Sequence, residues 1–214
     1  MPSRSLRPQR RLIVSMLLLA GTANFSWGQT PAAPAAQAIR LRATVEKVEP
    51  GSITVKARNG EVVTLALAGN LVVTEVYAID ISEIKPKSFI GSGALPQADG
   101  TLKAVEVLVF PEAMRGTGEG HRPWDLLPQS TMTNATVDEV MVGSSANTRT
   151  LMLKYKDGEK TLFVPPEAPV VTFKPGGASL LVAGAKIMVT AELRDGKPTA
   201  LRVTAGRKGF QPPM

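Results

Sequence analysis

The segment Ala43-Thr44-Val45-Glu46-Lys47-Val48 recurs later in the chain as Ala135-Thr136-Val137-Asp138-Glu139-Val140. Shorter matches follow both copies in the same order. They are Asn59-Gly60-Glu61 with Asp157-Gly158-Glu159, Leu71-Val72-Val73-Thr74 with Pro169-Val170-Val171-Thr172, and Asp99-Gly100 with Asp195-Gly196. A repeat this long indicates two copies of one small supersecondary unit, because each copy must bury the same faces. The repeat therefore decides the architecture before any motif does.

Within each copy, apolar residues alternate with polar ones, which is the pattern of half-buried β-strands. The alternation runs over residues 53–57 in the first copy and over residues 151–155 in the second. An Asn-Gly or Asp-Gly dipeptide follows each stretch and favours the positive φ angles of a tight hairpin turn. Each copy is therefore predicted to form five or six short strands, with at most one helical turn near residues 81–84.

Short strands in so short a unit usually close into a barrel, since closure removes the unpaired edges that invite aggregation. We therefore predict an all-β protein of two tandem small OB-like β-barrels joined by an ordered segment; a small open sandwich is the alternative. The first domain is expected at residues 39–111, the joining segment at 112–132 and the second domain at 133–208. Residues 209–214 would form a C-terminal tail.

The first 28 residues have the features of a secretory signal peptide: a basic start, an apolar run over residues 12–20, then small and polar residues. A membrane anchor and a twin-arginine signal at Arg10-Arg11 are the alternatives, but the apolar run is far shorter than the roughly 20 residues that span a bilayer. Residues 29–38 form a Pro/Ala-rich spacer. The chain contains no cysteine. We expect a periplasmic protein with no membrane span after leader cleavage.

The formal net charge of +7 suggests nucleic-acid binding until the charges are mapped. Arg4, Arg7, Arg10 and Arg11 lie in the leader, which carries no acid, so +3 remains for the rest of the chain. Lys and Glu are interspersed there, without the basic stripe that follows a phosphate backbone. The sequence therefore predicts no nucleic-acid partner.

The joining segment concentrates the most versatile side chains of the chain. It holds the only histidine and the only tryptophan outside the leader. One interpretation is a ligand-binding surface whose residues face an anionic or planar ligand: Arg115, His121, Arg122, Trp124 and Asp125. The other interpretation is structural: Trp124 and Leu126 fill the seam between the domains, and Arg122 pairs with Asp125 or Glu119.

A metal site would need several converging ligands. His121 with Met114, Met132 and Met214 is a candidate set for a soft ion such as copper, whereas the alternative is that the methionines only fill gaps. No spacing in the chain matches a zinc, calcium or haem signature. We therefore expect no bound metal and no cofactor.

Catalytic motifs are weak. Ser130, His121 and Asp125 are the residue types of a hydrolase triad, but no nucleophile-elbow pattern accompanies them. Ser82-Glu83-Ile84-Lys85 matches Ser-x-x-Lys without its partner motifs, and the glycine-rich stretch 115–120 lacks the strand-to-helix context of a phosphate loop. The sequence therefore does not predict an enzyme.

Several segments resemble one known family. They are Gly118-Glu119-Gly120-His121-Arg122-Pro123-Trp124-Asp125-Leu126, Met132-Thr133-Asn134-Ala135-Thr136-Val137, Lys154-Tyr155-Lys156-Asp157-Gly158-Glu159, Gly206-Arg207-Lys208-Gly209 and Pro212-Pro213-Met214. They resemble exported proteobacterial proteins that carry one or two OB-like domains of undetermined function, sometimes labelled metal transporter permeases. The resemblance implies tandem domains and export, and it transfers no ligand or catalytic residue.

These observations favour a periplasmic, non-enzymatic binding or adaptor protein that contacts a protein or small-molecule ligand at its junction. A periplasmic accessory protein that handles a transition metal such as copper is the alternative. An enzyme would require a deep pocket at the junction together with a carboxylate of perturbed acidity.

Overall fold

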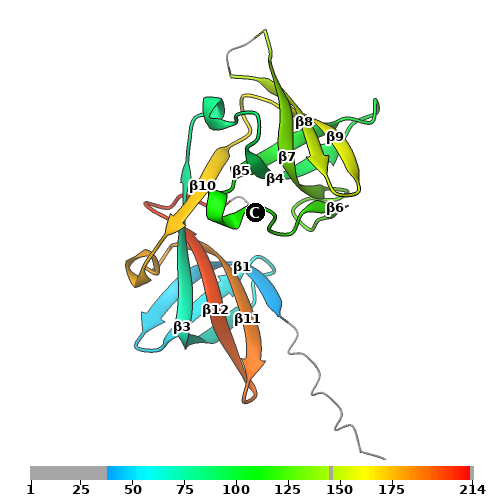
Figure 1. Ribbon diagram of the computed structural model, residues 1–214. Coiled ribbons are helices and arrows are strands. Elements are labelled where there is room, and N and C mark those ends of the chain that lie inside the picture. Colours follow the sequence, from blue (N-terminus) through cyan, green and yellow to red (C-terminus); the bar gives the residue numbers. More distant parts are fainter. Residues whose placement is uncertain (1–37, 145–146, 213–214) are drawn as a thin grey trace, which may run out of the picture. The chain divides into compact units, whose positions relative to one another are not determined.

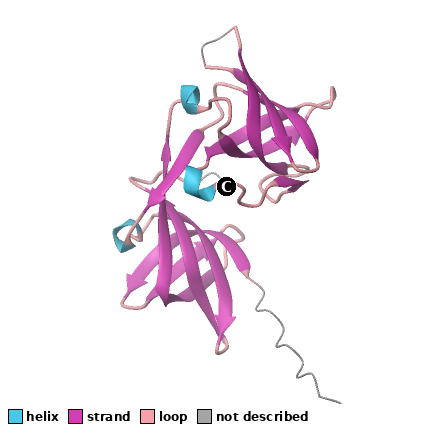
Figure 2. Cartoon of the chain, in the orientation of Figure 1, coloured by secondary structure: helices cyan, strands magenta, loops and turns pink. Residues whose placement is uncertain are grey.

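The computed structural model describes residues 38–144 and 147–212. The predicted leader, almost all of the spacer and Met214 lie outside these residues. Within the described ranges the regular structure consists of β-strands and short 3-10 helices, with no α-helix (Figure 2), so the all-β prediction is confirmed. The strands are β1 (Ile39–Glu49), β2 (Ser52–Ala57), β3 (Val62–Ala78), β4 (Phe89–Pro96), β5 (Leu102–Val109), β6 (Gly120–Pro123), β7 (Thr131–Val142), β8 (Arg149–Tyr155), β9 (Gly158–Val164), β10 (Val170–Pro175), β11 (Lys186–Arg194) and β12 (Lys197–Gly206). The 3-10 helices are η1 (Ile81–Glu83), η2 (Glu112–Met114) and η3 (Ala178–Leu180).

Local structure follows the sequence signals. The four Asn-Gly and Asp-Gly dipeptides of the repeats lie where β2 connects to β3, β4 to β5, β8 to β9 and β11 to β12. At the last of these, Asp195 and Gly196 have φ of 50° and 74°, the two positive angles of a tight hairpin turn. η1 forms where a single helical turn was expected, and Asp80 caps it by accepting a hydrogen bond from Ser82 N.

Strands β1, β2, β3, β12 and β11 form a closed five-stranded β-barrel, which we call the first ring. Consecutive members pair antiparallel, and the parallel pairing of β12 with β3 closes the circle. In Figure 1 the blue and cyan strands of the N-terminal repeat lie beside the orange and red strands of the C-terminal one. Inward-facing residues such as Val45, Ile53, Val189 and Val203 fill the interior and are almost completely buried.

Strands β5, β4, β7, β8 and β9 pair in a second closed circle, which we call the second ring. Antiparallel pairs connect β5 to β4, β4 to β7, β7 to β8 and β8 to β9, and β5 pairs with β9 in parallel. Ile90, Val107, Val137, Leu151 and Leu162 are buried inside it. Strands β6 and β10 belong to neither ring. β6 pairs with β7, and β10 pairs with β3 of the first ring and with β5 of the second.

The pairing does not follow the repeat boundaries at 39–111 and 133–208. The first ring takes three strands from the first repeat and two from the second. The second ring takes two strands from the first repeat and three from the second. This differs from the expectation that each repeat closes on its own strands. The reason is geometric, because an exchanged strand makes the same pairings as a strand from its own repeat and closes the circle equally well.

The crossing point is the antiparallel pairing of β10 with the second half of β3. Val76 lies opposite Phe173 in this pairing, and β10 continues beside β5 in parallel register, with Val171 next to Leu108. Val76, Leu108 and Val171 form a small buried cluster of their own, against which Phe110, Phe173 and Phe210 pack. The cluster therefore connects both rings and the C-terminal residues.

The two repeats share irregularities as well as strands. The β1–β2 register shifts between Val45 and Lys47, and the β7–β8 register shifts at the matching place, between Val137 and Glu139. The β11–β12 and β4–β5 hairpins shift at Thr190/Ala191 and Gly93/Ala94, which also match. Bulges bend a strand at a defined position, so their recurrence supports duplication of a whole folding unit.

We predict that Leu108→Ala lowers the free energy of unfolding by about 3 kcal/mol, because it leaves a cavity in the cluster that joins the rings. Urea titration followed by circular dichroism and by tryptophan fluorescence should give coincident single transitions, since neither ring closes without strands of both repeats. Leu193→Ala, whose side chain is 58% exposed, is the matched control and should change stability by less than about 0.5 kcal/mol. Two separate transitions in the wild-type chain would contradict the prediction.

Candidate functional site

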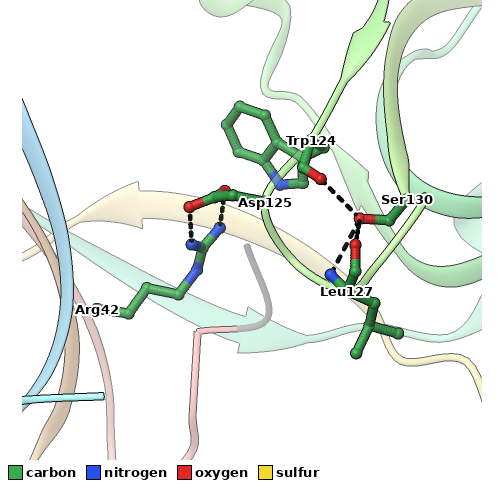
Figure 3. Close-up of polar contacts among 5 residues, drawn as sticks. All are labelled: Arg42, Trp124, Asp125, Leu127 and Ser130. Atoms are coloured by element: carbon green, nitrogen blue, oxygen red, sulfur yellow. Dashed lines mark hydrogen bonds and ion pairs between the residues drawn. The ribbon is translucent and has the colours of Figure 1, made fainter. Parts of the chain in front are cut away.

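The joining segment is ordered by pairing to the second ring. After η2 the chain forms β6, which pairs antiparallel with β7 so that Arg122 lies opposite Met132. The loop that follows closes on buried Ser130, whose hydroxyl accepts a hydrogen bond from Leu127 N at 3.0 Å. The same hydroxyl lies within hydrogen-bonding distance of the carbonyls of Trp124 and Leu127, at 2.9 and 2.7 Å (Figure 3). These bonds fix the backbone on either side of Trp124.

Arginine side chains surround Trp124. The guanidinium carbons of Arg40, Arg42 and Arg122 lie 5.5, 5.8 and 5.6 Å from the centre of the indole ring. Cations at this distance from the face of an aromatic ring are attracted by its quadrupole. The indole is half-buried, and its Nε1 is buried with no hydrogen-bond partner among the described residues. Trp124 thus brings positive charge from β1 and β6 to one place.

Asp125 attaches the joining segment to the first ring. Its carboxylate accepts two hydrogen bonds from the Arg42 guanidinium, at 2.8 and 3.1 Å, in a bidentate pair (Figure 3). These bonds, opposed in part by burial, hold the pKa of Asp125 below its ordinary value. Arg122 instead donates to the Gly118 carbonyl at 2.8 Å, and Glu119 accepts from Lys156 N. The expected pairing of Arg122 with Asp125 or Glu119 is therefore wrong, because β1 supplies the arginine that Asp125 binds.

A cleft of about 250 Å³ lies where the joining segment meets strands of both rings, and we call it the junction cleft. Its walls combine guanidinium groups, aromatic rings, thioethers and neutral polar groups. The lining residues are Arg40, Thr74, Phe110, Met114, Thr117, Gly118, Arg122, Trp124, Met132, Asn134, Phe173, Met188, Thr190, Arg202 and Thr204. Both repeats and the joining segment contribute.

The charge of the junction cleft is positive. Arg40, Arg122 and Arg202 line it, and no described lining residue is acidic. Burial, together with the charge of Arg40, lowers the pKa of Arg122, as expected for a cation held in a partly dry site beside another cation. The buried Asn134 presents Nδ2 to the Thr117 carbonyl at 2.9 Å, while its Oδ1 has no partner within the described residues. Such a cleft suits a ligand with an anionic group and a flat or apolar body.

The predicted site residues divide into two groups. Arg122 and Trp124 line the cleft, and Asp125 adjoins them. His121 precedes Arg122 on β6, so it faces the opposite side of the strand, where its Nδ1 lies 2.8 Å from Thr133 Oγ1 and its ring stacks near Tyr155. Arg115 binds both oxygens of Glu112 and the Lys87 carbonyl. Alternation along β6 therefore separates His121 from the arginine beside it.

The candidate metal set is separated in the same way. Met114 and Met132 line the junction cleft together with Met188, whereas the cleft lining does not include His121. Burial, with smaller contributions from Lys160 and Arg122, lowers the pKa of His121. The described residues hold no cluster of three or more His, Asp or Glu side chains suited to a metal ion.

The triad residues have other partners. Ser130 binds backbone groups of its own loop, His121 binds Thr133, and Asp125 binds Arg42. Each side chain uses its hydrogen-bonding capacity in fixing the joining segment. The geometry therefore supports a structural role for Ser130 and Asp125.

A buried carboxyl lies next to the junction without lining the cleft. Glu106 on β5 is 1% exposed, and neither of its oxygens has a hydrogen-bond partner among the described residues. Burial raises its pKa to about 8, opposed by the charge of Arg42. Leu126 covers this region: a Cβ added to Gly93 would lie 3.0 Å from Leu126 Cδ2 and 3.3 Å from Glu106 Oε1. Leu126 thus approaches the backbone of β4 closely at Gly93, where a side chain would obstruct it.

Sequence reasoning missed Arg40, Arg202, Glu106 and the aromatic residues Phe110 and Phe173. A signal existed for two of them, since Glu106 and Arg202 occupy equivalent places in the repeated segments 104–107 and 200–203. A charge reversal at one position of a duplicated strand marks a place where the two copies have different surroundings. Arg40 and the phenylalanines come together only through the strand exchange.

Comparison of the chain with protein-family models, with curated proteins and with solved structures finds no match. Over the described ranges, no helix has the length and apolar character needed to cross a bilayer.

We predict that Glu106→Gln stabilises the protein at neutral and alkaline pH. The folded-state pKa of about 8 lies above the ordinary value of 4.5. As the pH rises, the unfolded chain therefore loses its proton first, and stability falls between pH 4.5 and 8 by up to about 5 kcal/mol. The variant should match the wild type near pH 4 and exceed it increasingly towards pH 8, measured by urea unfolding.

The exposed Glu159→Gln, which removes a carboxyl from the surface, is the control for this experiment. A Glu106→Gln profile that runs parallel to that of the wild type would contradict the prediction.

Proposed function

We propose that this protein is a non-enzymatic binding module whose junction cleft holds a ligand with an anionic group and a flat or apolar body. One observation supports this most: Arg40, Arg122 and Arg202 line a cleft whose other walls include Trp124, Phe110 and Phe173. Guanidinium groups pair with carboxylate, sulfonate or phosphate in a fork geometry, and the rings supply stacking surface. The only strongly perturbed carboxyl, among the described residues, is Glu106, and it lies outside the cleft lining.

We further propose that the two rings are OB-like barrels derived from a tandem duplication with exchanged strands. The matching bulges and the matching parallel closures of β12 on β3 and β5 on β9 support this interpretation. The leader-like sequence of residues 1–28 supports export to the periplasm. The resemblance to exported proteobacterial proteins with OB-like domains agrees with both proposals.

Trp124 provides a direct test, because it is the only tryptophan after residue 28. We expect the anionic aromatic probe 8-anilinonaphthalene-1-sulfonate to bind the mature chain and change Trp124 emission. Arg122→Gln and Arg202→Gln should each weaken this binding by about tenfold or more, since each removes a charge-assisted hydrogen bond. Native mass spectrometry of exported protein should show the natural ligand.

Arg194→Gln is the matched control: it removes the same charge from β11, where Arg194 pairs with Glu192 outside the cleft. It should leave binding within about twofold of the wild type. Equal weakening by Arg194→Gln would show only a general charge effect. Unchanged binding in both cleft variants would overturn the proposal.

Metal handling is the second candidate, and the thioethers of Met114, Met132 and Met188 in the cleft favour it. Soft thioethers select Cu(I), although the neighbouring arginines repel any cation. Cu(I) titration of the mature chain, monitored by Trp124 emission, distinguishes the two candidates. Cu(I) uptake that is lost in Met132→Leu would support a copper site, whereas no Cu(I) uptake by the wild type would exclude this candidate.

A further inference from the structure

A second recess lies at the first ring and shares no lining residue with the junction cleft. We call it the basic groove. It has a volume of about 370 Å³ and runs over the surface of β1, β2 and β11. Gln211 and the buried Pro212 of the C-terminal segment line it together with Gly60 of the β2–β3 turn. It is therefore a bounded recess of limited size.

Strand register brings cations together in the basic groove. Thr44 on β1 pairs with Lys56 on β2 on one side and with Lys186 on β11 on the other. The two lysines thus lie at the same level, about 10 Å apart at two strand spacings. Two residues further along β1 and β2, beyond the pair Ala43 and Ala57, Arg58 N donates to the Arg42 carbonyl, which sets these arginines side by side. Four cations consequently face a single recess.

Three of these four cations, Lys56, Arg58 and Lys186, have no matching acid in the groove lining. The groove lining, all of it in the described residues, includes no Asp or Glu. Arg42 is paired with Asp125, and the charge of Arg58 also lowers the pKa of that carboxyl without a salt bridge. Lys186 Nζ donates to Thr44 Oγ1 at 2.9 Å, and within the described ranges neither Lys56, Arg58 nor Lys186 forms a salt bridge. Like charges on neighbouring strands destabilise a sheet, so this arrangement opposes stability.

We propose that the basic groove binds a compact polyvalent oxyanion, namely a phosphate or diphosphate group. Lys56 and Lys186 approach it as point charges from the two sides of Thr44, and Arg58 adds a planar fork from the end of β2. The bound anion would relieve the repulsion among the cations. The limited volume, closed by Pro212 and the β2–β3 turn, favours a compact anion over a polymer.

Calorimetric titration of the mature chain with sodium pyrophosphate in 150 mM NaCl tests the proposal. We expect binding that the double variant Lys56→Gln/Lys186→Gln weakens at least about tenfold, because both point charges are lost. The double variant Lys156→Gln/Lys197→Gln removes the same net charge from exposed positions outside the groove and should change affinity less than about twofold.

Thermal unfolding provides a second measurement. Without anion at low salt, Lys56→Gln/Lys186→Gln should unfold at the wild-type temperature or about 2 °C above it, since repulsion is removed. Pyrophosphate should raise the unfolding temperature of the wild type and leave that of the variant unchanged. No heat of binding at millimolar pyrophosphate, or equal weakening in the Lys156/Lys197 control, would overturn the proposal. Neither result bears on the junction cleft, which is tested separately with 8-anilinonaphthalene-1-sulfonate.

Discussion

The structure depends on the antiparallel pairing between β10 and the second half of β3. Because β3 continues without a break to Ala78, its beginning closes the first ring while its end lies against β10. The chain therefore leaves the first ring beside the second, where β4 pairs with β7 and β5 pairs with β9. Later in the chain, β10 lies against β3 and so returns the chain to the first ring, where β11 and β12 pair. Every ring edge is thus paired, and each repeat depends on the other for closure.

The exchange also determines how the joining segment lies. Since β5 and β7 belong to the same ring, residues 110–130 connect two of its strands and have length to spare. This excess length forms η2, β6 and the loop around Ser130, and it reaches the first ring through Arg42 and Asp125. Gly91 and Gly93 on β4 make room for it, because a Cβ at either position would meet Asn134, Phe110 or Leu126 at 2.7–3.1 Å. A segment that only linked two independent barrels would lack these contacts.

Much of the local structure could be predicted from the sequence. Alternation at residues 53–57 and 151–155, together with the Gly turns, indicated the strands and hairpins, and Trp124 indicated an ordered joining segment. The exchange of strands could not be predicted, because β12 makes the same inter-strand hydrogen bonds whether its partner belongs to its own repeat or the other. Arg40 and Arg202, far apart in sequence, meet at the cleft only through that exchange. His121 was placed with Arg122 by proximity in sequence, and the alternation of a strand put them on opposite faces.

Duplication also explains why the seam is asymmetric. Equivalent positions in two identical repeats would place the same charge on both sides, and like charges facing each other across a seam repel. Here the position that is Arg202 in one repeat is Glu106 in the other, and the positions of Arg40 and Arg42 correspond to Met132 and Asn134. Arg40 and Arg42 lie over the Trp124 ring, and Arg40 and Arg202 line the cleft, whereas Glu106 is buried and has a raised pKa. A carboxyl that is neutral in the folded protein does not cancel the field of the arginines. The divergence of the repeats thus places an arginine in the lining of the junction cleft in one copy and a buried carboxyl, outside that lining, at the equivalent position of the other.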